Sequence, residues 1–103
     1  MAEETIALQA QGRDNVATVF AEGVVGGTEV VVVDAMGART PLTVIGTIPY
    51  GHKVALRDIS VGERIIKYGE EIGVASQGIR MGGHVHVHNL DSMRGRGDLE
   101  EGA

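Results

Sequence analysis

Short apolar runs, separated by glycines and polar residues, recur along the whole chain. The runs are rich in valine and isoleucine, and no segment keeps a helical apolar period for several turns. β-Branched runs bounded by turn residues are typical of strands. The pattern therefore predicts an all-β domain of short strands and tight turns. The predicted strands are residues 5–8, 16–20, 29–34, 40–48, 52–56, 64–68, 72–75 and 84–88.

Three details refine this pattern. The four valines at 30–33 predict a strand that is covered on both faces or that meets another subunit. Pro41 has no backbone N–H, so we expect it at the start of a strand or in an edge strand. Residues 59–63 and 79–83 share an apolar-x-apolar-glycine spacing, which turn chemistry alone explains, and no internal repeat is inferred.

Length and composition limit the chain to one small domain. Its 103 residues support a single core, predicted over about 14–90, followed by a C-terminal tail at 91–103. The absence of cysteine excludes disulfides and thiolate metal sites and fits a reducing cytosol. A net charge of -5 and few aromatic residues argue against nucleic-acid binding. The acidic N-terminus and the lack of a long apolar run favour a cytoplasmic protein without membrane contact.

The densest polar pattern is at 84–88, where His84, His86 and His88 alternate with valines. In an extended strand these histidines share one face at steps of about 6.6 Å. Two histidines at i and i+2 can chelate one metal ion, with a third ligand from another element. His84 and His88 would lie about 13 Å apart on a straight strand, so binding one ion with all three requires a bend induced by glycine. A solvent-facing edge strand that happens to carry histidines is the alternative.

Further polar residues are candidates for chemistry. His52 and Lys53 follow a turn at a predicted strand entrance, where they could serve acid–base catalysis or hold an anion. A strand-capping histidine and a surface lysine are the simpler alternative. Arg94 and Arg96, flanked by glycines, could bind a carboxylate or sulfonate, unless they belong to a loose tail. No phosphate-binding loop and no serine-nucleophile motif occurs.

Several segments, in collinear order, resemble one known family. They are DNVA at 14–17, GHKVALRDI at 51–59, VGE at 61–63, IKYGE at 66–70, IG at 72–73 and GHVHVHN at 83–89. Together they are similar to the small SAF domain of the altronate and galactarate dehydratase family, over roughly 14–98 and most weakly between 24 and 47. The resemblance implies an all-β fold of the β-clip kind. Family members usually carry this domain ahead of a large catalytic domain, so the chain resembles the separate small subunit of split relatives such as sulfolactate sulfo-lyase.

The resemblance also implies a function. It points to the small subunit of a lyase that removes water or sulfite from a sugar acid or sulfonated hydroxy acid, with Fe2+ or alternatively Mn2+ at a shared site. A large lyase subunit would complete the pocket, because a domain this small does not enclose such a ligand alone. A homo-oligomer through the valine run stays open. A non-catalytic carbohydrate-binding or assembly module is the second hypothesis, and an autonomous metalloprotein is the third.

The candidate site residues, found from the sequence itself, fit this chemistry and fall into three groups. The catalytic candidates are His52, Lys53 and His86. The metal candidates are His84, His86 and His88. The substrate-binding candidates are Arg94, Arg96 and Asn89, the last of which directly follows the histidines.

Overall fold

The computed structural model describes residues 4–92, which form nine short strands and no helix. The predicted all-β class is therefore confirmed, and no helix in this range is long and apolar enough to cross a membrane. The strands are β1 (Ile6–Leu8), β2 (Val16–Val19), β3 (Glu29–Val33), β4 (Arg39–Thr43), β5 (Lys53–Ala55), β6 (Arg64–Lys67), β7 (Glu70–Ala75), β8 (His84–Val85) and β9 (Leu90–Ser92).

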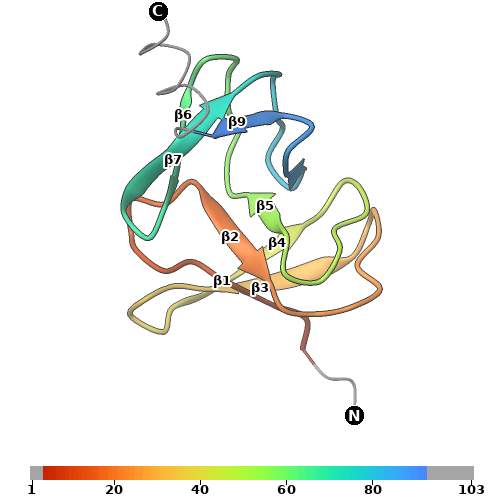
Figure 1. Ribbon diagram of the computed structural model, residues 1–103. Coiled ribbons are helices and arrows are strands. Elements are labelled where there is room, and N and C mark those ends of the chain that lie inside the picture. The colour runs from red at the N-terminus through yellow and green to blue at the C-terminus, as the bar shows by residue number, and fades with distance from the viewer. Residues whose placement is uncertain (1–3, 93–103) are drawn as a thin grey trace, which may run out of the picture.

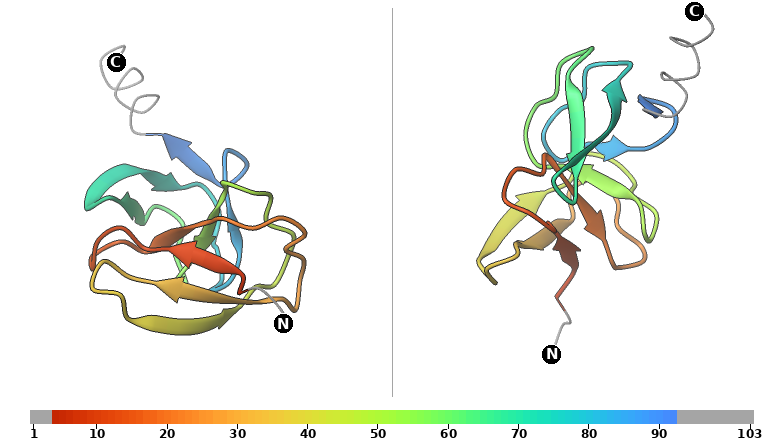
Figure 2. Two further views of the ribbon diagram at one scale, coloured as in Figure 1. Left: turned by 90° about the horizontal axis from the view of Figure 1, so that it is seen from below. Right: turned by 60° about the vertical axis from the view of Figure 1, so that its left-hand side comes forward.

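The strands form two sheets that are stacked on one another (Figures 1 and 2). The larger sheet has the order β4-β3-β1-β2-β5-β8, and the smaller has the order β6-β7-β9. Only β1 and β3 run parallel; the other neighbours are antiparallel. β1 lies in the middle of the larger sheet although the predicted core began at 14. β9 extends the fold to Ser92, and the rest of the predicted tail lies outside the described residues.

Each face of the larger sheet contributes to a separate apolar core. On one face, residues such as Ala17, Val19 and Val54 belong to a cluster around which the sheet curls. On the other face, Val16 and Ala55 pack with residues of the smaller sheet. The side chains on a strand alternate between faces, so β2 and β5 supply both cores and hold the two sheets together. The second core consists of Val16, Ala55, Ile59, Ile65, Ala75, Ile79 and Val85.

One turn geometry occurs four times, each time ahead of a strand. In every copy an apolar bridge residue is followed three positions later by a glycine whose φ is between 82° and 92°. Only glycine adopts such a φ without strain. The bridges pair Val24 with Ile48 and Ile59 with Ile79. The glycines are Gly27, Gly51, Gly62 and Gly82.

The hydrogen bonds of these turns show that the fold repeats itself. The N–H groups of Gly27 and Gly51 donate to Val44 and Val19, and those of Gly62 and Gly82 donate to Ala75 and Ala55, each at 2.8 Å. The shared spacing of 59–63 and 79–83 therefore marks two partner turns, and a second such pair lies earlier in the chain. The inference that the chain has no internal repeat is wrong for the backbone, although the side chains conceal the repeat.

The edge strand β4 confirms the expectation for Pro41. Val31, its partner across the sheet, donates its N–H to Thr5 on the β1 side at 2.7 Å. The pair of Val31 and Pro41 is therefore not hydrogen-bonded, and the nitrogen of Pro41 faces the open edge of the sheet. A proline there removes the donor that another strand would pair with. In β3 itself, Val30 and Val32 are buried while Val31 and Val33 are partly exposed, so the described chain covers only one face of this strand completely.

Candidate functional site

The histidine segment is a short strand followed by a turn. β8 ends at Val85, and the chain turns over residues 86–89. The side chain of Asn89, which is 7% exposed, closes the turn. Its Oδ1 accepts the N–H of His86 at 3.0 Å, and its Nδ2 donates to the carbonyl of His84 at 2.8 Å. The prediction of an extended strand over 84–88 is therefore wrong, because this amide replaces strand partners for both backbone groups.

The turn brings His84 and His86 to a third histidine from another strand entrance. His52 lies directly before β5, where its N–H donates to the carbonyl of Pro49 at 3.0 Å. Because β5 pairs with β8, the three imidazoles stack, with ring centroids 3.9 Å apart for His52–His86, 5.1 Å for His52–His84 and 5.7 Å for His84–His86. Nδ1 of His52 lies 2.8 Å from Nε2 of His84. We call His52, His84 and His86 the histidine triad.

His88 lies beside the histidine triad but is more exposed. Its ring centroid is 5.0 Å from that of His84, far less than the separation of about 13 Å expected on a straight strand. The turn over residues 86–89 supplies the bend that brings His88 toward His84, and it contains no glycine. Each residue of the triad offers one ring nitrogen, and these three nitrogens lie within 4.8 Å of one another. His52 therefore belongs to the group that could hold one metal ion, and His88 does not.

The surroundings of the triad are basic and keep the rings of His84 and His86 neutral. Burial, together with His88, His52, His86 and Lys53, lowers the pKa of His84 to about 4. Burial also lowers the pKa of His86, with further contributions from His52, Lys53 and His88. Burial lowers the pKa of Lys53 too, and the charge of Lys67 adds to that effect. At neutral pH His84 and His86 therefore keep the lone pairs that a metal ion needs.

The donor set of the triad fits a divalent metal ion. Two imidazole nitrogens on one tetrahedral ion, each about 2.0–2.1 Å from it, lie about 3.4 Å apart. The three nitrogens of the triad lie within 4.8 Å of one another, so small side-chain rotations reach that geometry. The 2.8 Å contact of His52 and His84 otherwise needs a proton on one of the two nitrogens.

The other predicted site residues fall in different places. Lys53 is half-buried at the start of β5, next to His52. The amide of Asn89 is bonded to the backbone of the histidine turn, a role that its position in the sequence did not indicate. Arg94 and Arg96 lie outside the described residues. The metal prediction left out His52, because no local pattern indicates which distant strand β8 pairs with.

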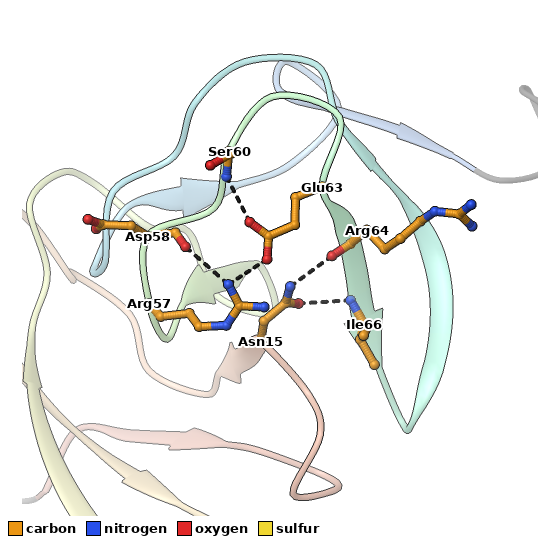
Figure 3. Close-up of polar contacts among 7 residues, drawn as sticks. All are labelled: Asn15, Arg57, Asp58, Ser60, Glu63, Arg64 and Ile66. Carbon is orange, nitrogen blue, oxygen red and sulfur yellow. Dashed lines mark hydrogen bonds and ion pairs between the residues drawn. The ribbon is translucent and has the colours of Figure 1, made fainter.

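The smaller sheet contains a second copy of the asparagine bridge. Asn15, which is 2% exposed, donates from Nδ2 to the carbonyl of Arg64 and accepts the N–H of Ile66 at Oδ1, both at 2.8 Å (Figure 3). Both asparagines thus bridge residues i and i+2 of one segment. In the copy at Asn15 the bridged side chains are Arg64 and Ile66, whereas in the copy at Asn89 they are two histidines. Substitution of Asn15 therefore serves as a control for substitution of Asn89, because it breaks the same kind of bridge away from the histidines.

Comparison with known proteins matches most of this chain to one family model. Residues 5–93 match the model described as the altronate/galactarate dehydratase SAF domain. The chain is 53% identical over 47 residues to (2R)-sulfolactate sulfo-lyase subunit alpha of Chromohalobacter salexigens, which covers 46% of this chain and 50% of that protein. The protein of the same name from Paracoccus pantotrophus is 47% identical over 53 residues, with 52% and 79% covered. Altronate dehydratase of Escherichia coli is 39% identical over 95 residues, which cover 85% of this chain and 18% of that enzyme. The matched part of this chain thus spans half of the first relative and a small fraction of the last.

Proposed function

Because this chain belongs to the altronate/galactarate dehydratase SAF domain family, we propose that it is the small subunit of a two-subunit lyase. The lyase removes water or sulfite from a sugar acid or a sulfonated hydroxy acid. The observation that carries the proposal is the histidine triad, in which two distant segments bring three imidazole nitrogens within 4.8 Å of one another. The names of the relatives, which are lyases or lyase subunits, support the reaction class.

In this proposal His52, His84 and His86 hold a divalent metal ion, with Fe2+ as the first choice and Mn2+ as the second. A bound divalent ion supplies Lewis acidity for the oxygen atoms of the substrate. His52 thereby changes from a catalytic candidate to a ligand, while His86 keeps its place in the site. Neutral imidazoles fit this role, since a protonated ring has no lone pair to donate.

The remaining candidates receive roles in binding and proton transfer. Elimination next to a carboxylate needs a base for the acidic C–H and an acid for the leaving group. His88 is exposed beside the triad, so it is the histidine best placed to exchange a proton with a leaving group and solvent. Lys53 is a cation next to the triad and stabilises the negative charge that develops on the substrate. Arg94 and Arg96 remain proposed contacts for an acid group.

A large partner subunit completes the pocket in this proposal. The rings of the triad are partly exposed, so they can face a second protein as well as a metal ion. Two of the relatives are named as subunits, and this chain matches only 18% of the single-chain altronate dehydratase. Active-site pockets commonly lie between domains, which fits a site whose second wall comes from another chain.

A metal titration of the isolated chain tests the triad. Co2+ added to the apo chain should give the visible d–d absorption of a histidine-bound ion at one equivalent. His86→Ala should lose that signal, because two imidazoles remain. His88→Ala is the matched control, since it removes a neighbouring histidine outside the triad and should bind Co2+ like the parent chain. Equal loss in both variants, or none in His86→Ala, would contradict the assignment.

A reconstitution experiment tests the reaction. The chain, mixed with a large lyase subunit of the same family and with Fe2+ or Mn2+, should dehydrate an aldonate or aldarate or release sulfite from a sulfonated hydroxy acid. His86→Ala should abolish turnover while the complex still assembles on gel filtration. Unchanged turnover in that variant would remove the catalytic role and leave the binding-module hypothesis in its place.

A further inference from the structure

A row of side chains crosses the larger sheet on the face opposite the curled core. The strand registers pair Leu8 with Val33 of β3 and with Thr18 of β2, and they pair Thr18 with Lys53 of β5. Paired residues in neighbouring strands place their side chains on the same face of a sheet. Val33, Leu8, Thr18 and Lys53 therefore follow one another across this face, and Lys53 lies directly beside Thr18.

The hairpin between β6 and β7 forms the opposite wall of a cavity over this row. The cavity has a volume of about 260 Å³, and its lining includes Leu8, Thr18, Phe20, Lys67 and Tyr68. Nζ of Lys67 lies 5.1 Å from the ring centroid of Tyr68. The walls are thus apolar for most of their length and basic where the hairpin meets the sheet.

The hairpin wall is fixed by a buried carboxylate. Asp14 is 5% exposed and accepts the N–H groups of Tyr68 at 3.0 Å and of Gly69 at 2.7 Å. These two residues are the turn of the hairpin, and both have positive φ, of 57° and 74°. Because Asp14 holds both amides, the position of Lys67 beside the cavity is set before any ligand arrives.

Lys67 lines this cavity and Lys53 lies next to its lining residue Thr18, and neither lysine has an acidic partner in the described structure. Lys53 and Lys67 are the only lysines of the chain, and neither forms an ion pair within residues 4–92. The ion pairs of that range all join an arginine to a glutamate instead. Asp34 also lines the cavity, but its Oδ1 accepts the N–H groups of Met36 and Ala38 in its own turn. Asp34 is thus the one carboxylate of the cavity lining, and it is held within its own turn. Two ammonium groups without an ion-pair partner, one in the lining and one next to it, are an arrangement that favours an anion in a chain with a net charge of -5.

We infer that this cavity binds the acid group of a small organic acid, with Lys67 as the cation of its wall, Thr18 as a hydroxyl donor and Lys53 as a second cation at its margin beside Thr18. The apolar part of the lining suits the short carbon chain of such an acid. The volume is just below the range of about 300–1000 Å³ that is usual for drug-sized ligands, which favours a short acid. The inference that an acid binds here depends only on these residues. The identification of that acid as the substrate of the lyase rests on the proposed function.

The effect of Lys67 on the pKa of Lys53 agrees with this arrangement. Lys53 also lies next to His52, and its charge contributes to the lowered pKa values of His84 and His86. An acid group held by Lys53 therefore lies at the margin of the histidine triad. The cavity and the triad would then be two parts of one extended binding region, joined by the start of β5.

An NMR titration of the full 15N-labelled chain tests the inference. The probes are glycolate for a carboxylate, methanesulfonate for a sulfonate and ethylene glycol as the neutral control, all at constant ionic strength. One or both anions should give saturable shifts of the Thr18, Lys67 and Tyr68 amides, and the stronger one identifies the preferred acid group. Equal shifts with ethylene glycol would overturn the inference.

Two variants make the test specific. Lys67→Gln should weaken anion binding at least about tenfold, because it removes a charged hydrogen-bond donor. Lys53→Gln should also weaken anion binding, because it removes the cation next to Thr18 at the margin of the cavity. Arg64→Gln is the matched control: it removes the same charge from the same strand, away from the cavity, and should leave the dissociation constant unchanged. Unchanged affinity in both lysine variants would overturn the site.

The outcome is independent of the metal test. If Lys67→Gln binds Co2+ like the parent chain but the anions do not bind the parent, this inference fails and the triad stands. If the anions bind and Co2+ does not, the acid site stands and the metal part of the proposed function fails.

Discussion

The histidine turn depends on one amide, so Asn89→Ala should separate folding from metal binding. The substitution leaves the N–H of His86 and the carbonyl of His84 without the partners they have at 3.0 and 2.8 Å. Each lost hydrogen bond is worth about 1 kcal/mol, and stranding the partly buried groups adds to that. We therefore expect the free energy of unfolding to fall by about 2–3 kcal/mol.

The same substitution should weaken Co2+ binding, because nothing else described bridges the backbone of His84 to that of His86. Residues that orient metal ligands typically change affinity by about 10–100-fold, which corresponds to about 1.4–2.7 kcal/mol. Stability is measured by urea denaturation of the apo chain, and affinity by Co2+ titration under conditions in which the variant is folded. Asn89→Asp keeps the hydrogen-bond acceptor and loses the donor. Its stability and Co2+ affinity should therefore lie between those of the parent chain and those of Asn89→Ala.

Asn15→Ala is the matched control for this prediction. It removes the same pair of side-chain hydrogen bonds, both at 2.8 Å, from the corresponding bridge in the smaller sheet. It should cost a similar 2–3 kcal/mol of stability, by the same reasoning, and leave Co2+ affinity within about twofold. The positioning role of Asn89 is refuted if its variant keeps full Co2+ affinity, or if Asn15→Ala loses affinity to the same degree.

Two further predictions concern pH and the sheet edge. Because the pKa of His84 is lowered from 6.5 to about 4, the unfolded apo chain takes up a proton that the native chain does not between these values, so the free energy of unfolding should fall as pH drops from 6.5 toward 4. Urea denaturation should show a smaller fall in His84→Gln, and equal slopes in the two chains would contradict the assignment. Pro41→Val should increase self-association in sedimentation velocity experiments, because it adds an outward N–H to the edge strand β4; an unchanged sedimentation profile would mean that Pro41 does not protect the edge.

Local sequence features determined much of the secondary structure. Short β-branched runs and turn glycines indicated the all-β class and most strands, because strand formation and turn formation depend on neighbouring residues. Strand predictions from local features were wrong where a distant contact or a buried polar side chain turned the backbone out of the predicted strand. The predicted strand over 40–48 ends at Thr43, since the chain turns there to form the bridge of Val24 with Ile48. The predicted strand over 84–88 ends at Val85, since Asn89 closes a turn instead.

The sequence by itself also supplied the candidate residues of the site, because the histidines at alternate positions and the His52–Lys53 pair are visible in the printed chain. Only the tertiary structure decided which of them meet. His52 and His84 are 32 positions apart, and they approach each other because β5 pairs with β8. Thr18 and Lys67 likewise line one cavity, with Lys53 next to Thr18, only because the hairpin of the smaller sheet packs over the larger sheet. Strand pairing over such separations depends on how the whole core packs, and no local pattern encodes it.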